Sequence, residues 1–130
     1  MSTFAEHLRS LGRDGLAALL DRRPDLATPP PATLRALAAR AATRVSLDRA
    51  LGRLDAGALA ACEAVLALGP TATPSAVAAG LGVDLPTCRP WLDAAAAHAV
   101  LLPDHDGRLT PAPGLAELLG PYPAGLGPPL

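Results

Sequence analysis

The chain of 130 residues lacks lysine, asparagine, glutamine and isoleucine, and its only aromatic residues are Phe4, Trp91 and Tyr122. Without lysine the chain cannot form a Walker A loop, which requires Lys after its second glycine. The absence of isoleucine and the small number of valines argue against an extensive β-sheet. Alanine and leucine, both strong helix formers, dominate the remaining residues. The composition therefore predicts a mainly α-helical fold.

Cysteine is also scarce. Cys62 and Cys88 lie far apart and form no Cys-x-x-Cys pair, so we expect two small core residues in a reducing compartment. The first residues contain no apolar secretory core, and no apolar run approaches the ~18 residues that a membrane span needs. The sequence thus predicts a cytoplasmic protein without a membrane partner.

Charge is divided unevenly along the chain. Residues 1–53 hold nine arginines and five acidic residues, whereas residues 54–130 hold two arginines and seven acidic residues. The first part therefore has a net charge of +4 and the second a net charge of −5. Any contact with a polyanion is expected in the first part.

Start and stop signals divide residues 1–54 into short helices, which we predict to form an N-terminal helical segment. Thr3 begins a first helix that Gly12 stops, and Asp14 is expected to cap a second. Residues 25–31 are predicted to be a stiff, extended connector because they include three consecutive prolines. Beyond them, the start signals of a third and a fourth helix are Thr33 and Ser46.

Residues 55–120 follow the order helix, helix, tight turn, helix and hairpin, which is typical of a winged helix-turn-helix domain. Asp55 is expected to cap the first helix of this unit, and Thr73 precedes a proline at the expected start of the second. The third helix is expected to begin between Asp84 and Thr87. Pro90 is tolerated only in the first turn of a helix, which favours Thr87 as the cap. An Asp-Gly turn near residues 104–107 predicts the hairpin, or wing, with strands at about 100–102 and 108–110. Residues 121–130 form a separate Pro- and Gly-rich tail.

Arginines are the candidate nucleic-acid-binding residues, because guanidinium groups bind phosphate oxygens in pairs. Arg40 and Arg44 are four residues apart, as are Arg49 and Arg53, so each pair is expected to share a helix face. A solvated face with local partners such as Asp48 is the alternative interpretation. In the winged helix, the corresponding contacts would be Arg89 on the third helix and Arg108 on the wing.

Metal binding and catalysis have little support in the sequence. His98, Asp104, His105 and Asp106 could bind Zn²⁺ or Mn²⁺, but a polar hairpin tip explains them more simply, and we expect no metal and no cofactor. No group of residues indicates a site for nucleotide phosphates or an activated nucleophile, so the protein is expected not to be an enzyme. Trp91 is expected in a core or an interface rather than in base stacking.

Several runs resemble the N-terminal region of a family of long actinobacterial proteins described as helicase-associated, or XPB-like helicase, proteins. They are LAALL at 16–20, RPDLATPPP at 23–31, LAARAATR at 37–44, ALGRLD at 50–55 and GPYPAGLGPP at 120–129. The resemblance implies a role linked to nucleic acid, in DNA repair or transcription, and no catalytic residue in this segment. Family members usually continue beyond this point.

Two hypotheses follow from these observations. The first is a non-catalytic winged-helix module that binds DNA weakly and without sequence preference, with no small-molecule substrate. The second is a module for protein–protein interaction or dimerisation, in which the partner is another protein or the rest of a longer family member. The fold alone does not distinguish them.

Overall fold

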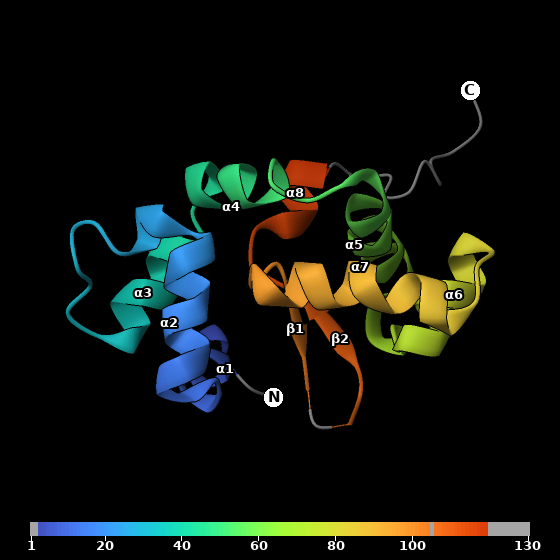
Figure 1. The fold of residues 1–130 in the computed structure, drawn as a ribbon, viewed down its shortest axis with the longest axis horizontal. Coiled ribbons are helices and arrows are strands. Elements are labelled where there is room, and N and C mark those ends of the chain that lie inside the picture. The colour runs from blue at the N-terminus through green and yellow to red at the C-terminus, as the bar shows by residue number, and fades with distance from the viewer. Residues whose placement is uncertain (1–2, 105, 120–130) are drawn as a thin grey trace.

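The structure, a computed structural model, describes residues 3–104 and 106–119. These residues form eight α-helices, two 3-10 helices (η1 and η2) and one small antiparallel hairpin, which confirms the mainly α-helical prediction (Figure 1). In chain order the elements are α1 (Phe4–Ser10), α2 (Gly12–Arg22), η1 (Pro24–Leu26), α3 (Leu34–Ala41), α4 (Arg44–Leu51), α5 (Ala56–Leu68), η2 (Gly69–Thr71), α6 (Pro74–Leu81), α7 (Leu85–Ala97), β1 (Leu101–Pro103), β2 (Leu109–Pro111) and α8 (Leu115–Leu119). None of the described helices is long and apolar enough to cross a membrane.

Side-chain caps explain where most of the helices begin. Thr3, Thr33, Asp55 and Thr73 each accept a hydrogen bond from the backbone amide three residues further on, at 2.8–3.2 Å. These bonds satisfy amides that have no partner inside the helix. The predicted starts of α1, α3, α5 and α6 are therefore confirmed.

Two predicted caps are wrong. Thr43, not Ser46, caps α4, and the hydroxyl of Thr43 accepts from the amide of Ser46 at 3.3 Å. Asp84, not Thr87, caps α7, and its Oδ1 accepts from the amide of Thr87 at 2.9 Å. As a result Pro90 lies inside α7 rather than in its first turn. Pro90 is exposed, so water can satisfy the carbonyl that its missing N–H leaves unpaired.

Two further expectations in the N-terminal segment need correction. Asp14 lies in the first turn of α2 and caps nothing, because that helix begins directly at Gly12, whose φ is +72°. Residues 25–31 are not uniformly extended, since η1 turns the chain so that Leu26 is fully buried. The turn therefore lies before the three consecutive prolines, where it places Leu26 in the core.

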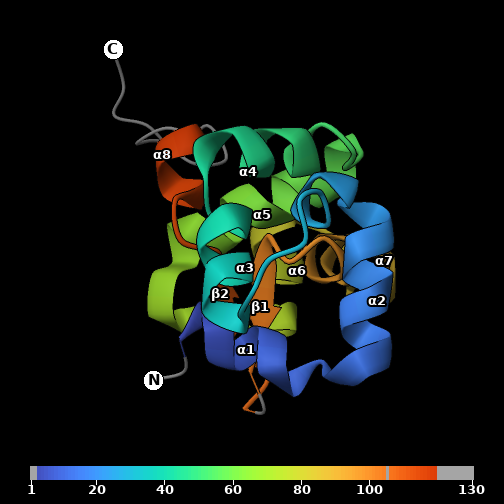
Figure 2. The same ribbon diagram turned by 90° about the vertical axis from the view of Figure 1, so that its left-hand side faces the viewer.

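The described buried apolar residues form two clusters. The larger one joins α4, α5, α6, α7, the hairpin and α8. The smaller one lies under α1, α2, η1 and α3, and it also includes Ala99, which follows α7, and Leu102 of β1. Figure 2 shows α3 between α4 and α1, with α2 alongside. The N-terminal helices therefore pack on the hairpin as well as on one another.

The predicted hairpin is present. Leu101 pairs with Pro111, Leu102 with Thr110 and Pro103 with Leu109. The other edge of β2 also has a partner, because the amide of Leu109 donates to the carbonyl of Ala72, between α5 and α6, at 2.8 Å. The hairpin is thereby fixed to the start of α6.

Candidate nucleic-acid interface

Arg40 and Arg53 hold neighbouring elements together. Arg40 donates from Nη1 to the carbonyl oxygens of Leu26, at 2.9 Å, and Pro29. Arg53 donates from Nη1 to the carbonyl oxygen of Arg22, the last residue of α2. Carbonyls at the C-terminal end of a helix lack helical partners, and a cation there also suits the helix dipole. These two guanidinium groups are therefore partly engaged within the chain.

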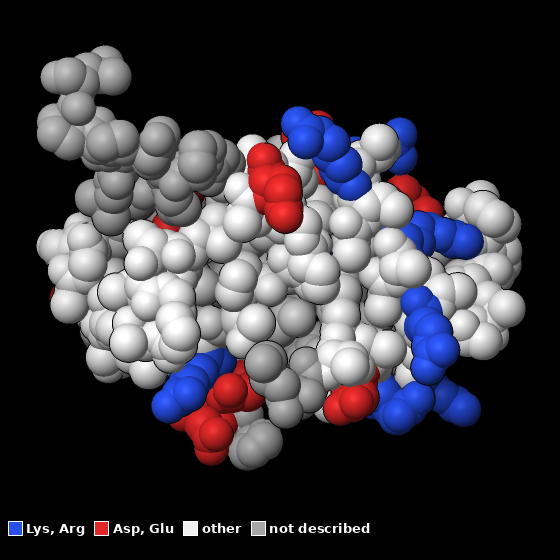
Figure 3. All heavy atoms as spheres, turned by 180° about the vertical axis from the view of Figure 1, so that it is seen from behind, with Lys and Arg blue, Asp and Glu red and all other residues white. Residues whose placement is uncertain are grey.

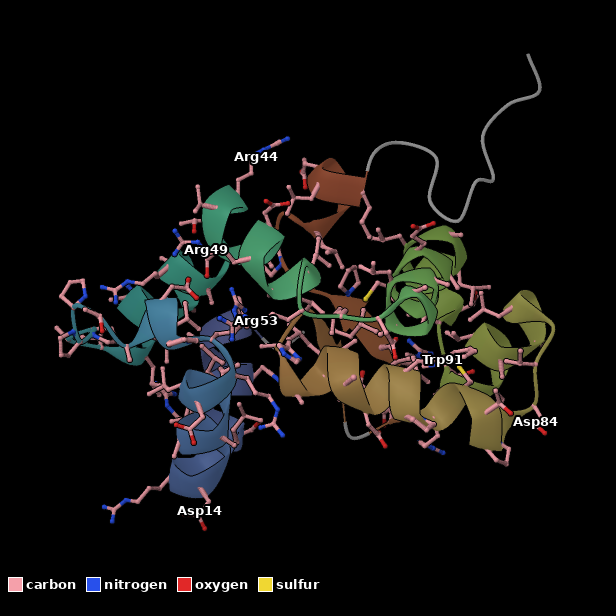
Figure 4. All side chains as sticks on the ribbon, turned by 45° about the horizontal axis from the view of Figure 1, so that its top comes forward. Asp14, Arg44, Arg49, Arg53, Asp84 and Trp91 are labelled. Atoms are coloured by element: carbon pink, nitrogen blue, oxygen red, sulfur yellow. The ribbon has the colours of Figure 1, made fainter. Side chains whose placement is uncertain are left out.

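Arg44 and Arg49 both lie on α4 and are exposed, and neither side chain forms a hydrogen bond with a described residue. In Figure 4, Arg44 points away from the body of the molecule, whereas Arg49 projects in a different direction. Five residues of an α-helix correspond to about 140° of rotation, so the two do not share one face. The spacing of Arg40 and Arg44 spans the break between α3 and α4, which removes the expected common face.

Arg89 is exposed on α7, the helix that would read bases in a winged helix. The other exposed positions of α7 are Pro86, Thr87, Pro90 and Asp93. The outward side of the helix therefore carries one cation and one carboxylate. Such a surface offers little electrostatic attraction to phosphates.

Arg108 is exposed in the turn between β1 and β2. The turn is organised by Asp104, whose Oδ1 accepts from the amides of Asp106 and Arg108, each at 2.9 Å. This geometry agrees with the interpretation of the tip as a polar turn. No group of three potential metal ligands occurs among the described residues, and His105 lies outside them.

Arg23 is the most enclosed arginine of the described chain, although the sequence analysis did not single it out. Its side chain is 1% exposed. It donates from Nη1 to the carbonyl oxygen of His98 at 3.0 Å, and from Nη2 to the carbonyl oxygen of Ala41 at 2.8 Å and to Oγ of Ser46 at 2.7 Å. One guanidinium thus connects the ends of α2, α3 and α7 with the first turn of α4.

Asp25 completes this network, because Oγ of Ser46 donates to its Oδ2 at 2.6 Å. Burial lowers the pKa of the Arg23 guanidinium from its ordinary value, and the charge of Asp25 opposes that shift. Nε of Arg23 has no hydrogen-bond partner among the described atoms. A sequence signal did exist: Arg23 follows Leu16, Leu19 and Leu20 at helical spacing, so it continues the apolar side of α2.

Trp91 packs on α5, which confirms its expected place in a core or an interface (Figure 4). The approach is close: a Cβ on Gly57 would lie 2.2 Å from Nε1 and Cε2 of the indole. Cys62 and Cys88 are free and buried, as expected. Burial raises the pKa of Cys62 to about 12, which disfavours a reactive thiolate at neutral pH.

Comparison of the chain with family models, with curated proteins and with solved structures gives no match. The candidate interface therefore depends on the geometry described above. That geometry leaves Arg44, Arg49, Arg89 and Arg108 exposed and engages Arg40 and Arg53 in the fold.

Proposed function

We propose that residues 55–119 form a winged helix-turn-helix unit. The packing of α5, α6 and α7 on one another, followed directly by the hairpin, supports this assignment. Three residues that include Gly82, at φ +72°, separate α6 from α7, and such short turns with a glycine are typical of helix-turn-helix motifs. The hydrogen bond from Leu109 to Ala72 adds the segment between α5 and α6 to the edge of the wing, in the manner of a reduced third strand.

We further propose that this unit is a non-catalytic, nucleic-acid-binding module that serves a helicase-associated system in DNA repair or transcription. The observation that carries the proposal is the helix-turn-helix and hairpin order, joined in the same chain to an N-terminal segment of net charge +4. The resemblance of several sequence runs to helicase-associated proteins supports the same function.

Binding should be weak and tolerant of sequence. Bases in the major groove are read mainly by Arg, Lys, Asn and Gln, and of these the chain contains only arginine. Arg89 is the single arginine on α7. Arg44 and Arg49 are the main phosphate contacts in this proposal, Arg89 and Arg108 are secondary contacts, and Arg40 and Arg53 contribute charge while they hold the fold.

Fluorescence anisotropy with a labelled duplex, titrated at several salt concentrations, tests the proposal. Four phosphate contacts predict a slope of log affinity against log salt of roughly −3 to −4. Arg44→Glu with Arg49→Glu should abolish binding while the circular dichroism spectrum stays unchanged. A zero slope, or normal binding by the double variant, would overturn the nucleic-acid proposal. ATP turnover by the pure protein in the presence of DNA would overturn its non-catalytic part.

The second candidate function is protein–protein interaction, and the outward side of α7 favours it. Four of its five exposed residues are not basic, which suits a protein partner better than a phosphate backbone. Sedimentation velocity over a range of concentrations tests whether the partner is a second copy of the chain. A concentration-dependent dimer that Arg89→Ala leaves intact, together with no DNA binding, would make this candidate the better one.

A further inference from the structure

The N-terminal layer, formed by α1, α2 and α3, carries exposed arginines that were not among the predicted binding residues. Arg9 on α1 and Arg35 on α3 are both exposed, and neither side chain forms a hydrogen bond with a described residue. Because α1 packs on α3 and α3 packs on α4, the layer continues into α4, the helix that carries Arg44 and Arg49 (Figure 2).

The charge of this layer differs from that of the other helices. Helices α1 to α4 together contain seven arginines and four acidic residues, whereas α5 to α8 contain one arginine and three acidic residues. Figure 3 shows the consequence on one face: basic side chains follow the edge formed by the N-terminal helices, with a few acidic ones between them. The half of that face formed by α5 and α6 is almost uncharged away from the hairpin tip.

We propose that an arginine edge, formed by Arg9, Arg35, Arg44 and Arg49, follows the phosphate backbone of duplex nucleic acid. The inference rests on the proposed nucleic-acid function and deepens it, because it extends the main contact from Arg44 and Arg49 on α4 to α1 and α3. In this arrangement the winged unit supports the layer and contributes secondary contacts. The ligand class is the sugar–phosphate backbone, without base readout.

The chemistry of the edge fits this ligand. A guanidinium group binds phosphate oxygens in a bidentate manner and keeps its charge at any physiological pH. A duplex presents charge on both strands along its whole length, so arginines that project in different directions from three helices can each face phosphates. Helix α3 contributes no acidic residue to oppose them, and the acidic residues of α1 and α4 are Glu6 and Asp48.

The test compares two double variants of equal charge change in the full chain. Arg9→Glu with Arg35→Glu alters the edge outside α4, and Arg89→Glu with Arg108→Glu alters the winged unit. Binding to a mixed-sequence duplex is measured by anisotropy over a range of salt concentrations. Loss of two phosphate contacts should make the salt slope smaller by about 1.8 and should weaken binding about tenfold or more at low salt. The matched variant in the winged unit should weaken binding less.

The outcomes separate this inference from the function on which it rests. If the wild-type chain does not bind the duplex, the proposed function fails and the inference fails with it. If the chain binds and the Arg9/Arg35 variant binds normally, the function stands and the arginine edge is wrong. Equal weakening by both double variants would mean that only net charge matters, which also overturns the edge. Equally tight binding to phosphatidylserine-containing vesicles would overturn the choice of nucleic acid.

Discussion

The layer of α1, α2 and α3 and the unit of α5 to α8 are held together by different means. Among the described residues, the cluster beneath the N-terminal layer has nine buried apolar residues and the other cluster has twenty, so the layer has less apolar packing to stabilise it. In compensation, Arg23, Arg40 and Arg53 bond to the carbonyls of neighbouring elements. Residues 56–119 show no such arginine side-chain bond in their described part.

This difference separates two uses of arginine that look alike in the sequence. Arg22 and Arg23 are neighbours, yet Arg22 is exposed and Arg23 is enclosed by three helix ends. A guanidinium has five donors in a fixed plane, so a single buried side chain can satisfy several carbonyls. The N-terminal layer therefore depends on one residue in a way that the larger cluster does not.

The largest expected effect comes from Arg23→Met, which removes this connection. The substitution keeps most of the side chain's volume but leaves the carbonyls of Ala41 and His98 and Oγ of Ser46 without the donors of Arg23. Removing one member of a buried charged network typically costs about 3–5 kcal/mol. We expect the free energy of unfolding in urea to fall by that amount. Backbone amide hydrogens should exchange fastest in α1 to α3.

Arg22→Met is the control for that experiment. The side chain of Arg22 is exposed and bonds only within its own helix, to the carbonyl of Ala18. Exposed substitutions of this kind usually change stability by less than about 0.5 kcal/mol. Equal destabilisation by both variants would show that the buried network contributes nothing special to the junction.

The larger cluster should be most sensitive at its closest approach. A methyl group at Gly57 would overlap the ring of Trp91, so Gly57→Ala must push the indole outward. Overpacking of this kind costs about 1–3 kcal/mol. Because Trp91 is the only tryptophan, its fluorescence should shift to longer wavelength as the ring becomes more exposed to water.

Gly80→Ala is the matched variant. Gly80 lies in α6, and a Cβ there would meet nothing within 4 Å. Alanine in place of glycine inside a helix stabilises by roughly 0.5–1 kcal/mol. The two substitutions should therefore change the melting temperature in opposite directions. A melting temperature that rises for both would show that Trp91 moves aside without cost.

The sequence predicted the elements of the larger unit well, because each depends on local signals. Asp55 and Thr73 were correct as caps, and the Asp-Gly turn correctly placed the hairpin. The errors at α4 and α7 arose because each helix starts with a competing cap three residues before the predicted one. Thr43 and Asp84 accept the amides of Ser46 and Thr87, the residues that had been predicted as caps.

The site was harder to predict than the fold. Helical spacing suggested a shared face for Arg40 and Arg44, but a break between α3 and α4 separates them. The bonds of Arg40 and Arg53 to carbonyls are tertiary contacts, and no local pattern encodes them. The binding role of all six predicted arginines stays a prediction, and so does the boundary between residues 54 and 55.

A smaller effect is expected where the two regions meet. Ala99 has φ +56°, a left-handed conformation that disfavours any side chain, and its methyl group is buried in the smaller cluster. Ala99→Gly removes about 1–2 kcal/mol of backbone strain and loses about 0.8 kcal/mol of methyl burial. We expect urea unfolding to show a change of less than about 1 kcal/mol, in the stabilising direction. A clear destabilisation would mean that packing on the N-terminal layer outweighs the strain.

The smallest effect concerns the caps, which also differ between the two regions. Threonine hydroxyls cap α1, α3 and α4, whereas the carboxylates of Asp55 and Asp84 cap α5 and α7, and a threonine, Thr73, caps α6. Hydrogen bonds from the side chain and the backbone of Thr87 lower the pKa of Asp84 from its ordinary value of 3.8. Since the folded pKa is below the unfolded one, this stabilisation is present above pH 3.8 and is lost as the pH falls through the folded value.

Thermal melts of the wild-type chain and of Asp84→Asn between pH 7 and pH 2 measure this contribution. Asparagine retains an acceptor for the amide of Thr87 but does not titrate, so the melting temperature should depend less on pH in the variant than in the wild type. Thr33→Ala removes a hydroxyl cap from α3 and should lower the melting temperature by the same amount at every pH, because a hydroxyl does not titrate in this range. Parallel pH profiles for the wild type and Asp84→Asn would mean that the charge of Asp84 adds nothing to its role as a cap. In that case the two regions would not differ in how acid affects their helix starts.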